Sequence, residues 1–311
     1  MKIKKILLTG SSGFVGKNIL SSNILDGFET LTPSSQDLNL LDKKLVEKYL
    51  KVNQPDLIIH SAGKVGGILK NVNSNYNFLL DNSLMGINLI SESLNSGIQN
   101  FINISSSCIY PKDYVIPLKE SDIMNGKLEP TNEGYALAKI IALKMTEFIN
   151  YDHGLNYKTI IPCNLFGPYD NFNLETAHMI PAVINKIHNA KLHDINPVTI
   201  WGDGKAFREF MYIEDLTNFI SFSIFNLDKV PNLVNVGTGR DYSIEDYYTK
   251  IASEIGYSGG FKFDLSKPIG MKRKLVDTSI LKNMGWESKF SIEEGIKKTY
   301  EYYKKVNDEK L

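Results

Sequence analysis

The sequence predicts an α/β fold: a doubly wound parallel sheet with helices on both faces, followed by a smaller C-terminal α/β lobe. Two observations support this. Over the first part of the chain, short apolar runs alternate with helical stretches, as in successive strand–helix–strand units. From Gly167 onward the elements vary in length and are separated by Gly, Pro and Asn. We therefore expect a sheet domain over residues 1–165, a returning segment of it near 212–237, and a lobe formed mainly by 166–311.

The composition excludes several classes of protein. The 311 residues include 35 Lys and Arg and 35 Asp and Glu, so no overall charge attracts nucleic acid or an anionic membrane. The apolar stretch in MKIKKILLTG is too short for a signal peptide or a membrane span. The 2 cysteines form neither a disulfide framework nor a zinc-ligand pattern, and Cys163 reads as core filling. We expect a cytoplasmic protein with no metal site and no nucleic-acid or membrane partner.

The individual elements follow from apolar periodicity and length. Short β-branched runs predict strands in the stretches KILLTG, FETLT, DLIIHSAG, NFINISSS and YKTIIPCNLFG. The intervening stretches predict helices over 13–25, 77–96 and 132–151. In an open parallel sheet the carboxyl ends of the strands share one edge, and ligands bind there. The residues that follow each strand are therefore the candidates for a site.

The first strand ends in a glycine-rich turn. Its pattern is G-x-x-G-x-x-G, formed by Gly10, Ser11, Ser12, Gly13, Phe14, Val15 and Gly16. Glycines suit a tight turn that lets the backbone approach a pyrophosphate, and the N-terminus of the next helix favours its negative charge. A glycine-rich structural turn is the alternative. The position between a first strand and a first helix favours a dinucleotide and a Rossmann-type fold.

The second strand is expected to end near Thr32, where such folds read the adenosine ribose. A carboxylate there selects NAD and a cation accommodates the 2′-phosphate of NADP, but this chain has Thr32, Pro33, Ser34 and Ser35. The choice between NAD and NADP therefore stays open. The following segment 37–42, with Asn39 and Leu40, is either an adenine contact or a helix-capping turn.

Two further segments follow strand ends. In HSAGKVGG, Ala62, Gly63 and Lys64 are expected to line the cofactor, with Lys64 toward the substrate, unless the loop is only a flexible connection. In FINISSSCIYP, Ser106 and Cys108 stand at the sheet edge, where the plain alternative is a strand-to-loop transition.

A tyrosine and a lysine stand four residues apart on the helix expected over 132–151. The spacing places Tyr135 and Lys139 on one helical face. An ammonium near a phenol lowers the pKa of the phenol and suits it to exchange a proton with a carbonyl oxygen near neutral pH. Together with the glycine turn and the serine-rich strand end, this pair predicts a carbonyl reductase site.

The chain resembles the extended short-chain dehydrogenases/reductases and, within them, the GDP-L-fucose synthase family, whose members are GDP-4-keto-6-deoxymannose 3,5-epimerase/4-reductases. The matching stretches follow in order over nearly the whole chain: HSAGKVGGI (60–68), SSCIYPK (106–112), LEPTNEGYALAK (128–139), NLFGPYDNF (164–172), HMIPAV (178–183), WGDGKAFREF (201–210), NVGTG (235–239) and KPIGMKRKLVD (267–277).

The resemblance implies catalytic roles. Ser106 and Tyr135 would hold the C4 carbonyl of the sugar, Tyr135 would deliver the proton, and Lys139 would contact the nicotinamide ribose. Cys108 and His178 would be the base and the acid that invert C3 and C5, with His178 also near the cofactor. From the residues alone, His178 is favoured as a capping or satisfied histidine at the start of a helix, and the resemblance reverses that preference.

The resemblance also implies a nucleotide-sugar pocket. Arg208 and Lys274 would face the diphosphate, and Trp201 would lie near the base or the sugar, whereas on residue type alone they are solvated charges and a core aromatic. The other expected substrate contacts are Lys64, Ser106, Ser107, Cys108, Asn164, Val183 and Lys186.

Cofactor, substrate and assembly are expected from the same resemblance. NADP(H) is favoured, although Ser12, Ser34 and Ser35 stand where the family often has basic residues, so NAD(H) stays open. The expected activity is epimerisation and reduction of a GDP-4-keto sugar to GDP-L-fucose by a homodimer. Two alternatives remain: a C4 reductase without epimerisation on a related GDP-4-keto sugar, such as a 6-deoxy-heptose or a colitose precursor, and a non-catalytic dinucleotide-binding sensor or scaffold.

Overall fold

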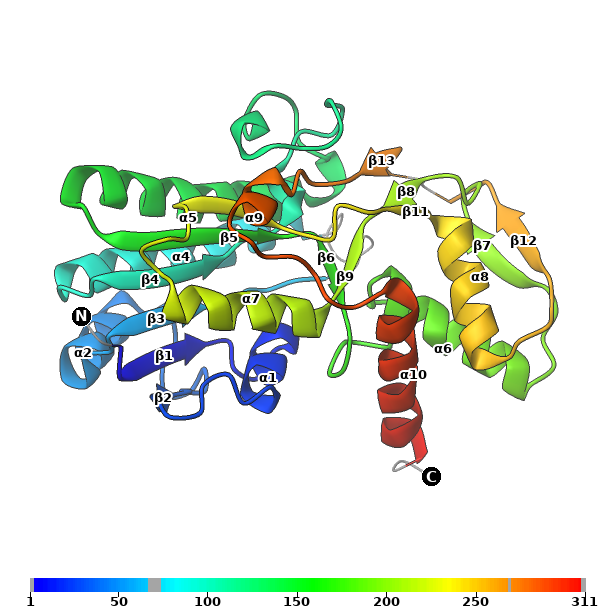
Figure 1. Cartoon of the computed structure of the whole chain (residues 1–311), viewed down its shortest axis with the longest axis horizontal. Helices are drawn as coiled ribbons and strands as arrows, with labels where there is room; N and C mark the ends of the chain where they lie inside the picture. The colour runs from blue at the N-terminus through cyan, green and yellow to red at the C-terminus, as the bar shows by residue number, and fades with distance from the viewer. Residues whose placement is uncertain (1–2, 67–73, 268–269, 309–311) are drawn as a thin grey trace.

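The computed structural model describes residues 3–66, 74–267 and 270–308. Its centre is a six-stranded parallel sheet in the order β10-β5-β4-β3-β1-β2 (Figure 1). The predicted doubly wound α/β fold is confirmed. The strands are β1 (Lys5–Thr9), β2 (Glu29–Leu31), β3 (Leu57–His60), β4 (Asn100–Ile104), β5 (Asn156–Pro162) and β10 (Leu233–Val236).

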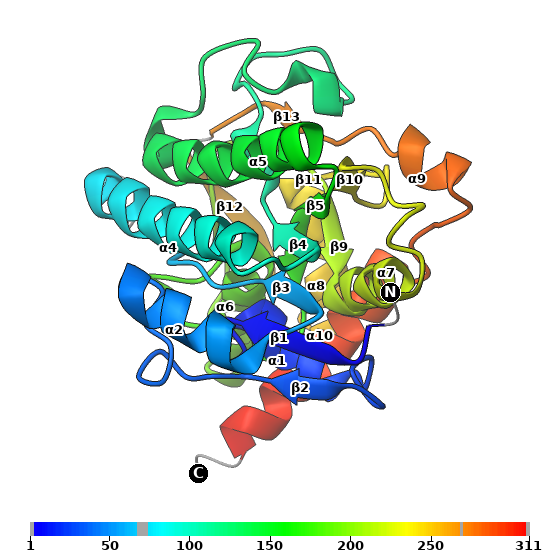
Figure 2. The ribbon, with the colours of Figure 1, turned by 90° about the vertical axis from the view of Figure 1, so that its left-hand side faces the viewer.

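Helices cover both faces of this sheet (Figure 2). Helices α2 (Lys43–Asn53), α4 (Asn75–Asn95) and α5 (Glu133–His153) lie on one face, and α1 (Phe14–Ser21) and α7 (Ile213–Phe225) lie on the other. Every residue of β3 and β4 is buried, as expected for parallel strands covered on both sides. Strand β10, from the segment expected to return, pairs with β5 at the sheet edge.

Two expected elements differ from the structure. The first helix ends at Ser21 instead of residue 25, because a polar turn with Asn23 at φ 58° follows it. The apolar run 157–167 is divided into β5 and β6 (Asn164–Phe166), and β6 leaves the large sheet to pair with β9 (Phe210–Tyr212). The chain thereby passes from the sheet into the lobe.

The lobe combines three helices with short strands. Its helices are α6 (Met179–Leu192), α8 (Ile244–Ile255) and α10 (Ile292–Asp308), and β7 (Val198–Trp201) pairs with β12 (Phe261–Asp264). A three-stranded sheet contains β11 (Tyr242–Ser243), β8 (Phe207–Arg208) and β13 (Arg273–Lys274). The remaining short helices are η1 (Ser107–Ile109), η2 (Glu120–Asp122), η3 (Pro130–Asn132) and α9 (Ser279–Asn283).

One large hydrophobic core runs from the sheet into the lobe. It includes Ile6 of β1, Ile184 of α6 and Tyr247 of α8, all fully buried. A second, smaller core lies under α2 and α4 around Leu50 and Ile90. The shared core fixes the lobe against the carboxyl edge of the sheet. The domain boundary expected between residues 165 and 166 stays a prediction. No helix in the described part of the chain has the length and apolar character to cross a membrane.

Candidate active site

The turn after β1 has a backbone that requires glycine at two positions. Gly10 has a φ of 74°, and a Cβ atom there would lie 2.5 Å from the backbone nitrogen of Ala62. A Cβ atom on Gly16 would overlap the carbonyl oxygen of Gly10. Helix α1 follows, and its N-cap residue Gly13 has no side chain to satisfy the N–H groups of the first turn. The turn, completed by Ser11, Ser12, Phe14 and Val15, therefore has the geometry that suits a pyrophosphate.

The loop after β3 is joined to this turn. The carbonyl oxygen of Thr9 accepts hydrogen bonds from the Ser61 backbone N–H at 3.2 Å and from the Ser61 hydroxyl at 2.7 Å. The Thr9 hydroxyl lies 2.8 Å from Nδ1 of His60. Burial, together with the nearby charge of Lys139, lowers the pKa of His60 to about 3 and keeps this ring neutral. The ends of β1 and β3 are thus held in one arrangement.

Helix α4 holds Lys64 by both its backbone and its side chain. The Lys64 N–H donates to Oδ1 of Asn82 at 2.8 Å, and Nδ2 of Asn82 donates back to the Lys64 carbonyl at 3.0 Å. The Lys64 ammonium pairs with Asp81 at 2.5 Å. A Cβ atom on Gly63 would lie 3.8 Å from Nζ of Lys139. The loop with Ala62, Gly63 and Lys64 therefore borders the predicted catalytic lysine.

The segment after β2 is partly a capping turn. Asp42 is the N-cap of α2 and accepts two backbone N–H groups at 3.0 and 3.1 Å, so for this residue the capping alternative is correct. The Ser34 hydroxyl donates to Asp37 at 2.6 Å, and this hydrogen bond lowers the pKa of Asp37. Asn39 accepts a backbone N–H at 3.1 Å, and Leu40 is buried. Contact of Asn39 and Leu40 with a cofactor stays a prediction.

The end of β4 and the start of α5 bring together Ser106, Tyr135 and Lys139. The Ser106 hydroxyl accepts the Cys108 N–H at 3.3 Å and caps η1. Lys139 is 7% exposed, and its ammonium donates to the Ile104 carbonyl at 2.9 Å. The same ammonium lies 5.8 Å from the centre of the Tyr135 ring. Burial lowers the pKa of Lys139 to about 8.

The pKa of Tyr135 shifts in the opposite direction from the one expected. We expected the Lys139 ammonium to lower it, but burial raises it above the ordinary value of 10. The neighbouring Cys108 adds to the increase, and a hydrogen bond with Ser106 opposes it. Desolvation of a phenolate here outweighs the cation, whose hydrogen bond goes to a backbone carbonyl. Tyr135 is thus held as a neutral phenol, the form that donates a proton.

Cys108 and His178, from distant parts of the chain, both lie near Lys274. The Lys274 ammonium donates to the sulfur of Cys108 at 3.7 Å. His178 is the solvent-exposed N-cap residue of α6, and the surrounding protein together with the charge of Lys274 lowers its pKa. The sequence led us to expect Lys274 at a diphosphate; in the structure its ammonium lies on the thiol. The buried Ser107 follows Ser106 in the same strand-end turn.

An aromatic group on the lobe surrounds Lys186. Its ammonium donates to the Thr199 carbonyl at 2.9 Å and to the Tyr248 hydroxyl at 3.3 Å. It lies 5.8 Å from the centre of the Trp201 ring, which is 43% exposed. Burial lowers the pKa of Lys186. Trp201 is therefore an exposed aromatic surface beside a cation, rather than the core residue of the alternative interpretation.

Arg208 and Lys274 are direct neighbours across β8 and β13. The Arg208 guanidinium donates to the Phe207 carbonyl at 2.8 Å, and burial lowers its pKa. The Asn164 side chain donates to the Glu209 carbonyl at 2.7 Å. Val183 lies in the core and is 2% exposed. The strand pairing places Arg208 opposite Lys274, whose ammonium donates to Cys108. Substrate contacts of these residues stay predictions.

Comparison with known proteins identifies the family. The sequence pattern of the NAD dependent epimerase/dehydratase family matches residues 6–237. The chain belongs to the NAD dependent epimerase/dehydratase family. A protein of Yersinia pseudotuberculosis named GDP-L-colitose synthase is 51% identical over 98% of this chain and 100% of its own length. A GDP-L-fucose synthase of Azorhizobium caulinodans is 44% identical over 97% of each chain.

Solved structures of the same kind resemble the whole chain. MlghC, a GDP-mannoheptose C4 reductase from Campylobacter jejuni with NADP bound, is 30% identical with a TM-score of 0.88, over 98% of this chain and 99% of that one. A GDP-L-fucose synthetase from Naegleria fowleri bound to NADP is 25% identical with a TM-score of 0.88, over 99% and 95%. The expected family, fold and enzyme class, a nucleotide-sugar oxidoreductase, are confirmed.

Sequence reasoning missed the buried carboxylate of Glu209. It is 1% exposed and accepts the N–H groups of Thr238 at 2.7 Å, Gly239 at 2.8 Å and Val276 at 2.9 Å. A Cβ atom on Gly237 would overlap this carboxylate, which explains the glycine in NVGTG. The signal was a lone acidic residue between the aromatic residues of FREF, which alternation alone reads as surface. Glu209, which lies between β8 and β9, thus joins the loop after β10 to the segment after β13.

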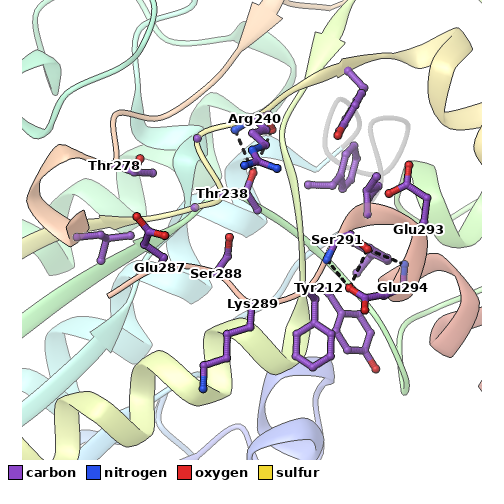
Figure 3. Close-up of a pocket in the computed structure, with 18 of the residues that line it drawn as sticks. Tyr212, Thr238, Arg240, Thr278, Glu287, Ser288, Lys289, Ser291, Glu293 and Glu294 are labelled. Carbon is purple, nitrogen blue, oxygen red and sulfur yellow. Dashed lines mark hydrogen bonds between the residues drawn. The ribbon is translucent and has the colours of Figure 1, made fainter. Parts of the chain in front are cut away.

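A separate cavity of about 400 Å³ lies between the loop 237–242, the linker 286–291 and the start of α10 (Figure 3). Its lining includes none of the predicted site residues. Several of its charges are already engaged, since Glu294 accepts the Ser291 N–H at 2.8 Å and Glu293 pairs with Lys250 at 2.6 Å. Across the described residues, no group of three or more His, Cys, Asp or Glu side chains is placed to hold a metal ion. The candidate active site of this family member is therefore the group around Ser106.

Proposed function

We propose that the chain is an NADPH-dependent epimerase/reductase that converts GDP-4-keto-6-deoxy-D-mannose to GDP-L-fucose, by inversion at C3 and C5 followed by reduction at C4. One observation carries the proposal: the residues suited to carbonyl reduction, Ser106, Tyr135 and Lys139, lie beside a thiol suited to proton exchange. Cys108 donates its backbone N–H to Ser106 and is close enough to raise the pKa of Tyr135.

The cofactor fits the residues that are present. The turn at Gly10 and Gly16 has no room for a Cβ atom, and the start of α1 has no side-chain cap, so this turn would hold the pyrophosphate. When bound, the nicotinamide supplies the hydride that C4 receives. Lys139 would contact the nicotinamide ribose, at the border of the Gly63 loop. NADP is the cofactor in both structural relatives described above, which supports the phosphorylated form.

Proton transfer falls to the protein. Tyr135, held as a neutral phenol by burial, would donate its proton to the C4 oxygen while Ser106 orients the carbonyl. Before reduction, the C4 ketone acidifies the hydrogens on its neighbouring carbons. Cys108 would remove such a proton from one face, and His178 would return one to the other. Epimerisation and reduction therefore use different side chains of one site.

A second candidate substrate is the 4-keto precursor of GDP-L-colitose. The relative named GDP-L-colitose synthase is 51% identical to this chain, against 44% for the GDP-L-fucose synthase. In this case the chain would reduce C4 with inversion of fewer ring carbons. A related GDP-4-keto heptose is the third substrate of this kind, supported by the likeness to the heptose reductase.

One measurement distinguishes these candidates. The chain is mixed with NADPH or NADH and synthetic GDP-4-keto-6-deoxy-mannose, the loss of absorbance is followed, and the product is analysed by NMR. GDP-L-fucose is the expected product. A C4 alcohol with unchanged C3 and C5 would favour the reductase alternative, and no oxidation with any GDP-4-keto sugar would favour a non-catalytic dinucleotide sensor.

The assembly is proposed to be a homodimer through α4 and α5, which pack side by side (Figure 2). Helix α4 exposes large apolar side chains at a helical spacing: Tyr76, Leu80, Leu84 and Ile87, between 36% and 72% exposed. Such a stripe on a long helix is typical of an interface. Helix α5 adds Leu137 and Phe148 on its own exposed positions. A twofold pairing of this face would cover the stripes of both copies.

A further inference from the structure

Lys274 is a buried cation whose hydrogen-bond partner is a sulfur atom. It is 8% exposed and donates to Cys108 at 3.7 Å. None of the ion pairs formed within residues 3–66, 74–267 and 270–308 includes it. Its neighbour Arg273, by contrast, donates twice to Asp241, at 2.6 and 3.0 Å. Adjacent residues of β13 therefore have different partners: a carboxylate on the outside and a thiol on the inside.

The backbone on both sides of Lys274 is fixed by Glu209. The Glu209 N–H donates to the Lys274 carbonyl at 3.2 Å, and the Glu209 carboxylate accepts the Val276 N–H at 2.9 Å. Lys274 also lies opposite Arg208 in the pairing of β13 with β8. A buried carboxylate thus holds the strand that brings the ammonium to Cys108.

We propose that Lys274 is a positioning residue for the base of the reaction: its ammonium stabilises the thiolate of Cys108, so that this sulfur removes the proton next to the C4 ketone. The physical reason has two parts. A buried ammonium is costly unless an anion accompanies it, and the neutral thiol is only a weak acceptor. The thiolate is the form in which cysteine acts as a base or nucleophile. The inference rests on the proposed function, because it gives Cys108 the task of base.

The proton exchange balances without any further reactant. The C–H bond breaks, an S–H bond forms at Cys108, and the electron pair moves into an enolate whose oxygen is that of C4. His178 then gives a proton to the opposite face of the same carbon, and the ketone is restored. Cys108 returns its proton to solvent and His178 takes one up. The charge of Lys274 also favours proton release from His178, because it lowers the pKa of that ring.

The competing role is direct contact between Lys274 and the substrate diphosphate. Loss of such a contact would raise KM for the keto-sugar and leave the chemistry at C3 and C5 intact. Loss of a partner of the thiolate would slow proton exchange and leave KM nearly unchanged. The two roles therefore differ in measurable ways.

The first experiment measures Cys108 without any substrate. The chain is treated with iodoacetamide at pH 7, and the two cysteine peptides are quantified by mass spectrometry; Cys163, at 5% exposed, is the internal control for folding. Lys274→Met should alkylate at Cys108 at least about tenfold more slowly than the wild type. Lys274→Arg should restore most of the rate, and Arg273→Met should not change it. Equal rates in Lys274→Met and the wild type would overturn the proposal.

If Lys274→Met unfolds and exposes Cys163, the wild type alone still tests whether the folded protein activates Cys108. Cys108 in the folded chain should then react faster at pH 7 than the same cysteine in urea, and a slower reaction would overturn the proposal.

The second experiment uses the keto-sugar in deuterated water with oxidised cofactor. Lys274→Met should incorporate deuterium at C3 and C5 at least about tenfold more slowly, with KM changed by less than about threefold. A large increase in KM with unchanged exchange would assign Lys274 to the diphosphate instead. If the wild type acts on no keto-sugar, the proposed function fails, while the alkylation rates still report on the pair.

Discussion

Replacing Lys139 by Met is expected to make the protein more stable and nearly inactive. Lys139 is 7% exposed, and burial lowers the pKa of its ammonium from 10.5 to about 8. At roughly 1.4 kcal/mol per tenfold change in proton affinity, carrying this charge into the folded state costs about 3 kcal/mol at pH 7. Methionine removes that cost but leaves the Ile104 carbonyl without its donor, a loss of about 1 to 2 kcal/mol. The net expectation is a gain of about 1 to 2 kcal/mol in the free energy of unfolding.

The pH dependence gives the sign of the effect. Because the folded pKa is lower, the unfolded chain binds more protons between about pH 8 and 10.5, so wild-type stability gains with pH across that window. The advantage of Lys139→Met should therefore shrink over the same window and reverse above it, when only the lost hydrogen bond remains. Turnover should fall by about two to four orders of magnitude, with weaker cofactor binding.

Urea unfolding followed by tryptophan fluorescence at pH 7 and above pH 10, combined with NADPH oxidation, measures both effects. Lys158 provides a matched control, since it is 5% exposed on β5, donates to Asn232 at 2.9 Å and has a pKa lowered by burial. Lys158→Met should keep its turnover. A Lys139→Met variant that is less stable than the wild type by 1 kcal/mol or more at pH 7 would refute the argument that burial dominates this ammonium.

Three substitutions and one comparison of cofactors test the site and the assembly further. Tyr135→Phe should fold normally and lose about two to four orders of magnitude in turnover, because only the donated proton is removed; wild-type turnover would contradict this role. In deuterated water with oxidised cofactor, the wild type should incorporate deuterium at C3 and C5 of the keto-sugar. Cys108→Ser should not, since a hydroxyl is a far weaker acid than a thiol, and with NADPH it should yield mainly the unepimerised alcohol. Because Ser34 and Ser35 carry no charge, discrimination between NADPH and NADH should be modest. The ratio of their kcat/KM values should correspond to a free-energy difference within about 1 to 3 kcal/mol. A preference for NADH exceeding a thousandfold would contradict this. Leu84→Glu should convert the dimer to a monomer in sedimentation, whereas a monomeric wild type at micromolar concentration would exclude the proposed interface.

The parts of the site that the sequence predicted are those whose chemistry is local. The turn from Gly10 to Gly16 is formed by seven consecutive residues, and its glycines are required by contacts with the turn itself and with Ala62. Tyr135 and Lys139 share a helical face through their spacing alone. Strand ends follow from apolar runs, so the position of Ser106 at the sheet edge follows from the residues that precede it.

The parts that sequence reasoning could not place depend on tertiary contacts and burial. Cys108 and Lys274 meet although 166 residues separate them, and the partners of Glu209 come from two other segments. The pKa of Tyr135 was predicted in the wrong direction because spacing reveals a neighbouring cation but not the loss of solvent around the phenol. Sequence reasoning also could not assign Asn82, which holds the Lys64 backbone, because this contact depends on how α4 lies against the loop after β3.

The two buried ammonium groups of the site have a common property. Within the described residues, neither Lys139 nor Lys274 forms an ion pair with a carboxylate; one donates to a backbone carbonyl and the other to a thiol. A buried cation that has no anionic partner lowers the stability of the folded protein. Two anions belong to the reactions proposed for this site: the C4 oxygen, which gains negative charge beside Tyr135, and the thiolate of Cys108, which is present before it takes up the proton. Lys139 is thus placed where negative charge develops during the reaction, and it lowers the energy of the charged intermediate more than that of the resting protein. Lys274 instead stabilises the base in the form that is active before proton transfer. This arrangement is the reason that loss of Lys139 is expected to raise stability and abolish activity together.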